Sequence, residues 1–377
     1  MNGRDYLGKD IPKLGFGLMR LPRVNGDSSP VDITQLREMV DLFLEAGFTY
    51  FDTAYIYNDS EAAIKEALVE RYPRESYQLA TKLPSWSARS REHAESMFYK
   101  SLERTGADYF DFYLLHNIDT HHLSAFERYD TWDFLQKRKD EGLIKHLGFS
   151  FHDTADVLDK VLTEHSEMEF VQLQINFADW ESKSIQSRSC YETAHKHNKP
   201  IIIMEPVKGG SLVSLPPQAI AELTSHSPDA SVASWGMRFA GSLDRIITVL
   251  SGMSNLEQMR DNIATFSNFV PLDEAERSTI DRVVSELESI RTIPCTTCGY
   301  CLDVCPSNIA IPAIFENMND LTLYGNLTGC RFGYFWETRG HERGLASDCT
   351  QCGNCEEVCT QKINIIKELK HAVSIFE

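Results

Sequence analysis

The sequence lacks a membrane-spanning segment and is poor in basic residues. No uninterrupted apolar run approaches the length of about 18 residues that a spanning helix needs. The 37 Lys and Arg residues stand against 55 Asp and Glu residues, which gives a net charge of −18. Nucleic acids and anionic membranes attract basic surfaces, so this charge argues against both. We expect no nucleic-acid partner and no membrane insertion.

An export signal is also missing from the sequence. Met1 to Asp10 contain no apolar stretch of the kind that a signal peptide carries. Cysteine is plentiful, and eight of the ten cysteines lie in two tight clusters near the C-terminus. Without an export signal, such clusters indicate metal ligation in a reducing compartment rather than disulfides. We therefore expect a cytoplasmic protein.

The chain is long enough for one large domain and a small one. From Lys13 to about Phe266, short β-prone runs alternate with amphipathic helical stretches. The predicted strands are Leu14–Met19, Tyr50–Thr53, Tyr77–Thr81, Phe110–Leu115, His146–Phe149, Phe170–Asn176, Pro200–Met204 and Ile246–Ser251. The helices predicted between them include Ile33–Ala46, Arg91–Thr105, Phe126–Glu141 and Ser187–His197.

The number and spacing of these units favour one α/β architecture. Eight strand–helix units in roughly 250 residues is the pattern of a closed (β/α)₈ barrel, the TIM barrel. A doubly wound open sheet is the alternative, because periodicity does not show closure. Against it, no Gly-x-Gly-x-x-Gly motif follows the first strand, and Gly15-Phe16-Gly17 is too short a match. We therefore predict the barrel.

Four polar residues lie at the ends of adjacent predicted strands, where such barrels keep their active sites. Asp52 ends the second strand, Lys82 the third and His116 the fourth, and Tyr57 follows the second. A neighbouring Lys⁺ lowers the pKa of a tyrosine, and a buried Asp⁻ keeps the lysine charged. The histidine can orient a carbonyl oxygen beside the tyrosine hydroxyl. The four residues suit proton donation to the oxyanion that forms when hydride reaches a carbonyl carbon.

At these residues the chain resembles the aldo/keto reductase family, over roughly residues 10 to 270. The resemblance implies that Tyr57 is the general acid/base, that Lys82 and Asp52 tune it, and that His116 positions a small carbonyl substrate. It also implies a nicotinamide cofactor across the barrel mouth. The matching pieces are Asp52-Thr53-Ala54-x-x-Tyr57, Thr81-Lys82, Leu114-Leu115-His116, Gly148-Phe149-Ser150, Gln172-Leu173-Gln174, Pro206-Val207-x-Gly209-Gly210-x-Leu212 and the segment from Gly252 to Asn262.

The same resemblance assigns the cofactor contacts, with several departures. Ser150 and Gln174 fall where the family holds the carboxamide, and Met204 replaces the usual aromatic that stacks on the nicotinamide ring. The implied cofactor-binding residues are Ser150, Gln174, Met204, Val207, Gly209, Leu212, Gly252, Gln258 and Asn262. Gln258 stands where members that prefer NADPH place an arginine for the 2′-phosphate. We therefore expect NAD(P)H binding with a preference for NADH.

The strongest pattern is a pair of identical cysteine runs near the C-terminus. Each has the spacing Cys-x-x-Cys-x-x-Cys-x-x-x-Cys, and two copies are typical of two-cluster ferredoxins. The fourth cysteine of each run then ligates the other cluster. Zinc is the rival interpretation, since single Cys-x-x-Cys pairs commonly bind it. The predicted ligand sets are Cys295, Cys298, Cys301 and Cys359 for one 4Fe-4S cluster, and Cys349, Cys352, Cys355 and Cys305 for the other.

Together the patterns predict a barrel over residues 1–270, a linker helix over 271–292, and a small, mostly helical ferredoxin-type domain over 293–377. The insert between the cysteine runs has a helical stretch, Ile311–Leu323, and Thr360 replaces the proline usual after the last cysteine.

Three functions remain open. The protein is a carbonyl reductase whose clusters transfer electrons to a redox partner or stabilise the fold. Alternatively, it is an iron–sulfur electron-transfer protein whose barrel is a docking scaffold, or one whose barrel binds a flavin. The intact set of four residues favours the reductase.

Overall fold

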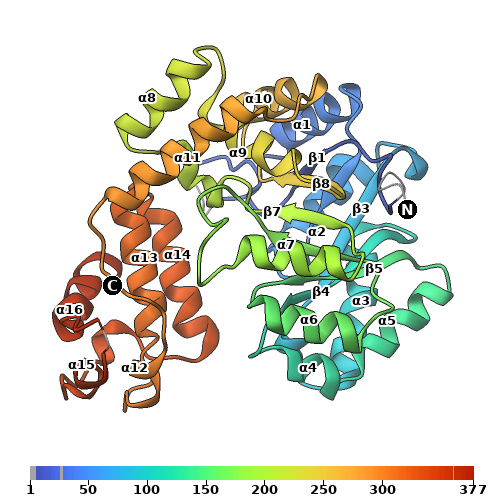
Figure 1. Cartoon of the computed structure of the whole chain (residues 1–377). Coiled ribbons are helices and arrows are strands. Elements are labelled where there is room, and N and C mark those ends of the chain that lie inside the picture. The colour runs from blue at the N-terminus through green and yellow to red at the C-terminus, as the bar shows by residue number, and fades with distance from the viewer. Residues whose placement is uncertain (1–5, 26–28, 360) are drawn as a thin grey trace. The chain divides into compact units, whose positions relative to one another are not determined.

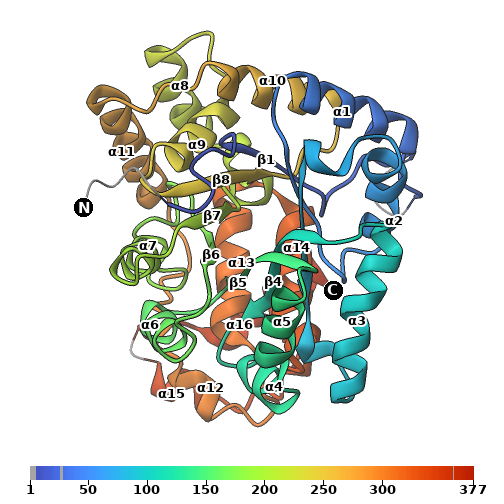
Figure 2. The same cartoon turned by 90° about the vertical axis from the view of Figure 1, so that its right-hand side faces the viewer.

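The computed structural model describes residues 6–25, 29–359 and 361–377. Parts of two features considered above, the first five residues and Thr360, lie outside these ranges. Eight parallel strands pair in chain order, and β8 closes on β1 to form a barrel (Figure 2). The strands are β1 (Leu14–Gly17), β2 (Tyr50–Asp52), β3 (Gln78–Leu83), β4 (Phe110–Ile118), β5 (Ile144–Phe151), β6 (Phe170–Gln174), β7 (Ile201–Met204) and β8 (Ile246–Ser251). The prediction of a closed barrel is confirmed.

Amphipathic helices follow the strands, and those that belong to the same compact unit as the barrel lie outside it (Figure 2). Their ends use ordinary capping chemistry: Ser90 accepts from the His93 amide at the start of α3, and Gly106 ends it with φ 66°. The helices of this part of the chain are α1 (Ile33–Glu45), α2 (Ser60–Ile64), α3 (Arg91–Thr105), α4 (Leu123–Arg128), α5 (Thr131–Asp140), α6 (Ala155–Glu164), α7 (Ser187–Lys196), α8 (Pro217–His226), α9 (Val232–Gly241) and α10 (Leu256–Ser267).

One predicted helix and three predicted strands differ from the structure. The stretch predicted as one helix over Phe126–Glu141 is two helices, α4 and α5. Asp130 stands between them with φ 53°, a left-handed conformation that ends the first helix. Strands β3, β4 and β5 are also longer than predicted, because polar residues such as Lys82 and His116 continue them.

The register of the strands places the apolar core below a polar rim. Tyr50, Ala80, Phe112 and Leu114 form part of the buried interior. Because side chains alternate in direction along a strand, the residues two positions further on share the same inner face. Gly148 belongs to this face, where a Cβ would collide with the Phe170 carbonyl oxygen.

The chain divides into two compact units, which we describe separately. The first comprises residues 1–206 and 234–272, and the second comprises residues 207–233 and 273–377. The second unit therefore includes the loop and α8 that follow β7. The domain boundaries expected from the sequence, at residues 270 and 292, stay predictions.

The second unit is helical and has its own core. Helices α13 and α14 pack side by side (Figure 1), and Ile314, Phe315 and Tyr334 lie fully buried among them. Its helices beyond α8 are α11 (Glu274–Ser289), α12 (Tyr300–Asp303), α13 (Ile311–Tyr324), α14 (Leu327–Glu337), α15 (Asn354–Val358) and α16 (Ile365–Phe376). Among the described residues, no helix is long and apolar enough to cross a bilayer.

Candidate functional site

The barrel brings three of the four predicted catalytic residues into direct contact. Lys82 Nζ lies 2.5 Å from Asp52 Oδ1 and donates to the Thr53 carbonyl oxygen at 2.8 Å. The same Nζ is 5.0 Å from the centroid of the Tyr57 ring. The side chains of Lys82 and Asp52 are only 1% and 4% exposed, so the ion pair is shielded from water. Such a buried pair keeps a positive charge beside the tyrosine.

Burial and charge set the protonation of these groups. Burial raises the pKa of Tyr57 above its usual value of 10.0; Lys82 opposes the rise, and Asp52 adds to it. Burial alone would lower the pKa of Lys82, but Asp52 and Tyr57 together raise it. The expected lowering by Lys82 is therefore present but smaller than the effect of burial. A protonated tyrosine suits the role of general acid.

His116 lies beside the tyrosine. The two ring centroids are 5.7 Å apart and the rings meet edge-on. Burial, and after it the charges of Lys82 and two other histidines, holds the pKa of His116 well below 6.5. The imidazole is therefore neutral. Its Nδ1 is buried and has no hydrogen-bond partner within the described part of the chain, which leaves an unsatisfied polar atom at this rim.

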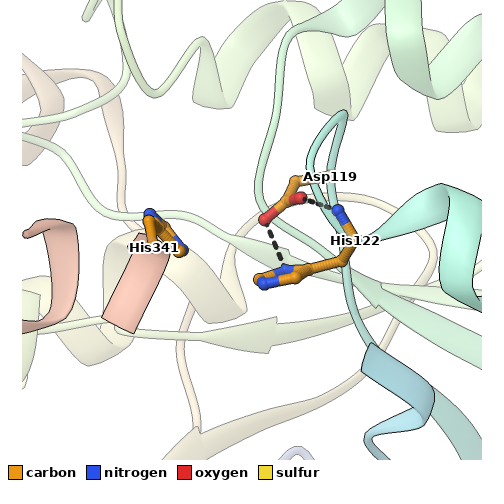
Figure 3. Close-up of side chains that lie close together, drawn as sticks. All are labelled: Asp119, His122 and His341. Atoms are coloured by element: carbon orange, nitrogen blue, oxygen red, sulfur yellow. Dashed lines mark hydrogen bonds and ion pairs between the residues drawn. The ribbon is translucent and has the colours of Figure 1, made fainter. Parts of the chain in front are cut away.

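A second histidine supports the end of β4 and was not foreseen from the sequence. His122 pairs with Asp119 through Nδ1, at 2.8 Å from Oδ2, and its backbone amide donates to Oδ1 (Figure 3). Its ring stacks on Trp86 at 4.8 Å, and the Trp86 indole donates to the His116 carbonyl oxygen. This network fixes the backbone at His116. The only signal in the sequence was the dense group of polar residues after His116.

Gln172 is a further residue that sequence reasoning did not assign a role. Its Nε2 donates to Asp52 Oδ2 at 3.3 Å, and the side chain is buried. Asp52 is thus held by two donors, one for each carboxylate oxygen. Burial raises the pKa of Asp52, and Lys82 and Gln172 oppose that rise. Gln172 therefore orients the acid that orients the lysine.

Three of the implied cofactor residues lie on neighbouring strands of the barrel rim. Ser150 pairs in register with Gln172, and Gln174 pairs with Met204. The Ser150 hydroxyl accepts a hydrogen bond from the backbone amide of Asn117 at 2.8 Å. The amide of Gln174 donates to Asp179 at 3.2 Å. Polar groups that could meet a carboxamide are thus present and already held in place.

The segment after β8 carries the other three barrel residues. Asn262 is buried and donates to Ser251 Oγ at 2.6 Å, whereas Gly252 and Gln258 are exposed. Gln258 has a structural role, because its Oε1 accepts from the Ser254 amide at 2.7 Å at the start of α10. Arg20, which the sequence did not single out, lies close by, since a Cβ at Gly252 would be 3.9 Å from its Nη1. A basic group therefore lies near the segment in which Gln258 replaces the usual arginine.

The remaining cofactor residues, Val207, Gly209 and Leu212, belong to the second unit. They lie at and within a short 3₁₀ segment, η4 (Lys208–Val213). Gly209 and Gly210 have φ values of 60° and 96°, conformations that explain two successive glycines.

The eight clustered cysteines gather in two pockets within the second unit. Cys305, Cys349, Cys352 and Cys355 line a pocket with an empty volume of about 300 Å³. Cys295, Cys298, Cys301 and Cys359 line another of about 340 Å³. These are the two interleaved ligand sets expected from the spacing. Four thiols facing one small cavity are the donor set of an iron–sulfur cluster.

Both pockets use the same backbone turn. The residue before the second cysteine of each run, Thr297 or Gln351, has a positive φ, as does the glycine after it, Gly299 or Gly353. Successive turns of this kind direct amide groups toward a bound anion. The Ile309 amide also points at Cys305 Sγ, at 3.4 Å. The residues present therefore fit two cysteine-ligated, negatively charged clusters.

Comparison with known proteins identifies the class. The model of the aldo/keto reductase family matches residues 13–285, and the model of a 4Fe-4S dicluster domain matches residues 294–366. The chain belongs to the aldo/keto reductase family and carries an iron–sulfur domain at its C-terminal end.

Individual relatives agree with this assignment. The 4-dihydromethyl-trisporate dehydrogenase of Mucor mucedo is 24% identical over 315 residues, covering 74% of this chain and 92% of the relative. An aldo-keto reductase of family 1 from Rattus norvegicus is 30% identical over 177 residues, covering 42% and 52% of the two chains. The match thus spans about half the length of the latter relative.

A solved aldo-keto reductase from Bacillus halodurans, in its holo form, has the same fold. Its TM-score is 0.58 at 24% identity, and the match covers 72% of this chain and 92% of that one. A Klebsiella pneumoniae structure in complex with NADP and acetate gives 0.57 at 19% identity, covering 73% and 92%.

Proposed function

We propose that the protein reduces the carbonyl group of a small molecule with a nicotinamide cofactor, using Asp52, Tyr57, Lys82 and His116. The observation that carries the proposal is the buried contact of Lys82 with Asp52 beneath the Tyr57 ring. A charged lysine in a site closed to water has a strong effect on a neighbouring hydroxyl. A merely structural ion pair would not need a tyrosine and a neutral histidine beside it.

Each residue has a distinct task in this reaction. The bound nicotinamide supplies hydride to the carbonyl carbon. Neutral His116 donates a hydrogen bond to the carbonyl oxygen and holds it beside Tyr57. Tyr57 then gives its proton to the developing oxyanion, and Lys82 stabilises the negative charge left on the tyrosine oxygen. Asp52 and Gln172 keep Lys82 in place. We propose Ser150, Gln174, Met204, Val207, Gly209, Leu212, Gly252, Gln258 and Asn262 as cofactor contacts.

The two cysteine pockets support a second part of the proposal. We infer two 4Fe-4S clusters that transfer electrons to or from a redox partner protein. Clusters pass single electrons, whereas a nicotinamide passes two as hydride, so the two chemistries need not share one path. The doubled four-cysteine spacing, in which the fourth cysteine of each run lines the pocket of the other run, supports clusters over zinc, as does the match to a 4Fe-4S dicluster domain.

Substitution of Tyr57 by Phe tests the catalytic assignment, because it removes the acidic proton and keeps the ring. We expect carbonyl reduction to fall by about 10²–10⁴, the usual contribution of a general acid, with the dissociation constant for the dinucleotide unchanged. Tyr55→Phe, on the same loop, is the matched control and should keep its rate. Near-normal turnover of the Tyr57 variant, with chemistry rate-limiting, would remove Tyr57 from this role.

Protein purified without oxygen distinguishes the reductase from a flavin-containing electron-transfer protein. Bound flavin in the absorption spectrum, with failure to bind either dinucleotide, would favour a flavin-containing electron-transfer protein. Binding of a dinucleotide by a protein without flavin supports the reductase.

A further inference from the structure

The loop that follows β7 is packed as part of the cluster-binding unit rather than the barrel. Residues 207–233 group with residues 273–377 in the second unit. Within this segment, Lys208, Gly209 and Gly210 are three successive residues with positive φ values of 49°, 60° and 96°. A lysine rarely adopts this conformation unless its surroundings hold it there.

Two helices of the second unit hold the loop. Lys208 Nζ forms an ion pair with Asp320 Oδ2 at 3.2 Å, and the two side chains are 13% and 26% exposed. The same Nζ is 6.0 Å from the Tyr324 ring centroid. Asp320 and Tyr324 are four residues apart on α13 and therefore share one face of that helix. Asn326, the N-cap of α14, donates to Ser211 Oγ at 3.3 Å.

Helix α13, which contacts Lys208 of the loop, also lines the two cysteine pockets. Ile311, the first residue of α13, lines both pockets, and Pro312 and Phe315 line one of them. The helix is 14 residues long, about 21 Å from end to end. One rigid element thus connects the walls of both pockets with the anchor of the loop.

We propose that Asp320 is a positioning residue for dinucleotide binding, which it supports by fixing the Lys208–Val213 loop in its binding conformation. The inference rests on the proposed function, in which Val207, Gly209 and Leu212 of this loop contact the dinucleotide. Because Lys208 is held by Asp320, the loop keeps one conformation, in which the amides of Gly210 and Leu212 donate to the Val207 carbonyl oxygen at 3.0 and 3.2 Å. A backbone that is already ordered binds more tightly than one that must be ordered on binding.

Hydrogen exchange of the cluster-loaded protein without dinucleotide tests whether Asp320 orders the loop. Asp320→Asn keeps the size of the side chain and removes the ion pair. We expect the amides of residues 207–213 to exchange about tenfold faster or more, with the barrel strands unchanged. Glu288→Gln, which removes an exposed charge from α11 of the same unit, should leave the loop unchanged. Equal exchange rates of these amides in the unmodified protein and the Asp320 variant would refute the role of Asp320 in ordering the loop.

Dissociation constants for NADH and NADPH test whether the ordered loop supports dinucleotide binding. Asp320→Asn and Lys208→Met should each raise the constant about tenfold, and the double variant should be no weaker than either single one. Tighter binding by the Asp320 variant would overturn the proposal, because Asp320 would then compete with the dinucleotide. Equal constants would refute its role in binding. Failure of the unmodified protein to bind either dinucleotide refutes the proposed function itself and, with it, this role for Asp320.

Discussion

Replacing Lys82 with Met should destabilise the barrel at neutral pH, because it leaves Asp52 buried without its counter-charge. The two side chains are almost fully buried and their charged atoms are 2.5 Å apart. Removing one partner of such a pair costs about 3–5 kcal/mol. Methionine has nearly the length of lysine, so little of the loss comes from an empty space.

The loss should depend on pH in a defined direction. Without Lys82, burial raises the pKa of Asp52 further above its usual 3.8. A carboxyl group whose pKa is raised by folding contributes full stability below that usual value, and the contribution is lost as pH rises through the folded-state pKa. The Lys82 variant should therefore lose stability as the pH rises above about 4. The unmodified protein should change less over the same range.

Denaturant-dependent hydrogen exchange of the β2 and β3 amides measures this free energy within the barrel. The matched control is Lys145→Met, because Lys145 is half exposed and its partner Asp111 also pairs with Arg74. We expect a change below about 1 kcal/mol for the control. Asp52→Asn combined with Lys82→Met should recover most of the loss. A cost below about 1 kcal/mol for Lys82→Met alone, without pH dependence, would refute the reasoning.

Three further predictions concern other parts of the chain. Burial would raise the pKa of Glu169, but His146, Lys139 and a backbone amide lower it from 4.5 to about 2. Glu169→Gln should therefore cost about 1–2 kcal/mol above pH 4.5, because the Glu169 side chain is 27% exposed and water screens its partners. The cost should fall as the pH drops from 4.5 towards 2, and an equal cost of the substitution at pH 3 and pH 7, measured by denaturation, would contradict this. Gln258→Arg should shift dinucleotide preference toward NADPH relative to the control Gln258→Met, which loses the same hydrogen bond from the Ser254 amide. A tenfold preference of the unmodified protein for NADPH, about 1.4 kcal/mol, would refute our expectation of NADH. Anaerobic analysis should find about eight irons and eight acid-labile sulfides per chain, and tightly bound zinc without sulfide would exclude the clusters.

The sequence predicted the barrel well because its signals are local. All eight predicted strands occur, and their order along the chain determines their order in the sheet. Asp52, Lys82 and His116 could be placed together because the ends of parallel strands meet at one rim. The cysteine sets could be paired because their spacing is specific.

Long-range contacts were not predictable in the same way. Gln172 is 120 residues from Asp52 in the chain, and only the closed register brings them together. Gln258 was interpreted only as a cofactor contact, whereas its side chain also accepts a hydrogen bond from the Ser254 amide before α10. The ion pair of Lys208 with Asp320 joins segments more than 100 residues apart. A helical pattern over Phe126–Glu141 gave no sign of the left-handed Asp130 that divides it.

The central claim is that the barrel transfers hydride directly from a nicotinamide to a carbonyl carbon. A single turnover with NADH deuterated at the transferred C4 position, performed without oxygen in ordinary water, tests it most directly. The account predicts that the alcohol product carries deuterium on its carbinol carbon, and that Tyr57→Phe slows this transfer. A carbinol hydrogen derived from solvent would contradict the account, because it would mean that electrons reach the substrate through the clusters or a flavin instead.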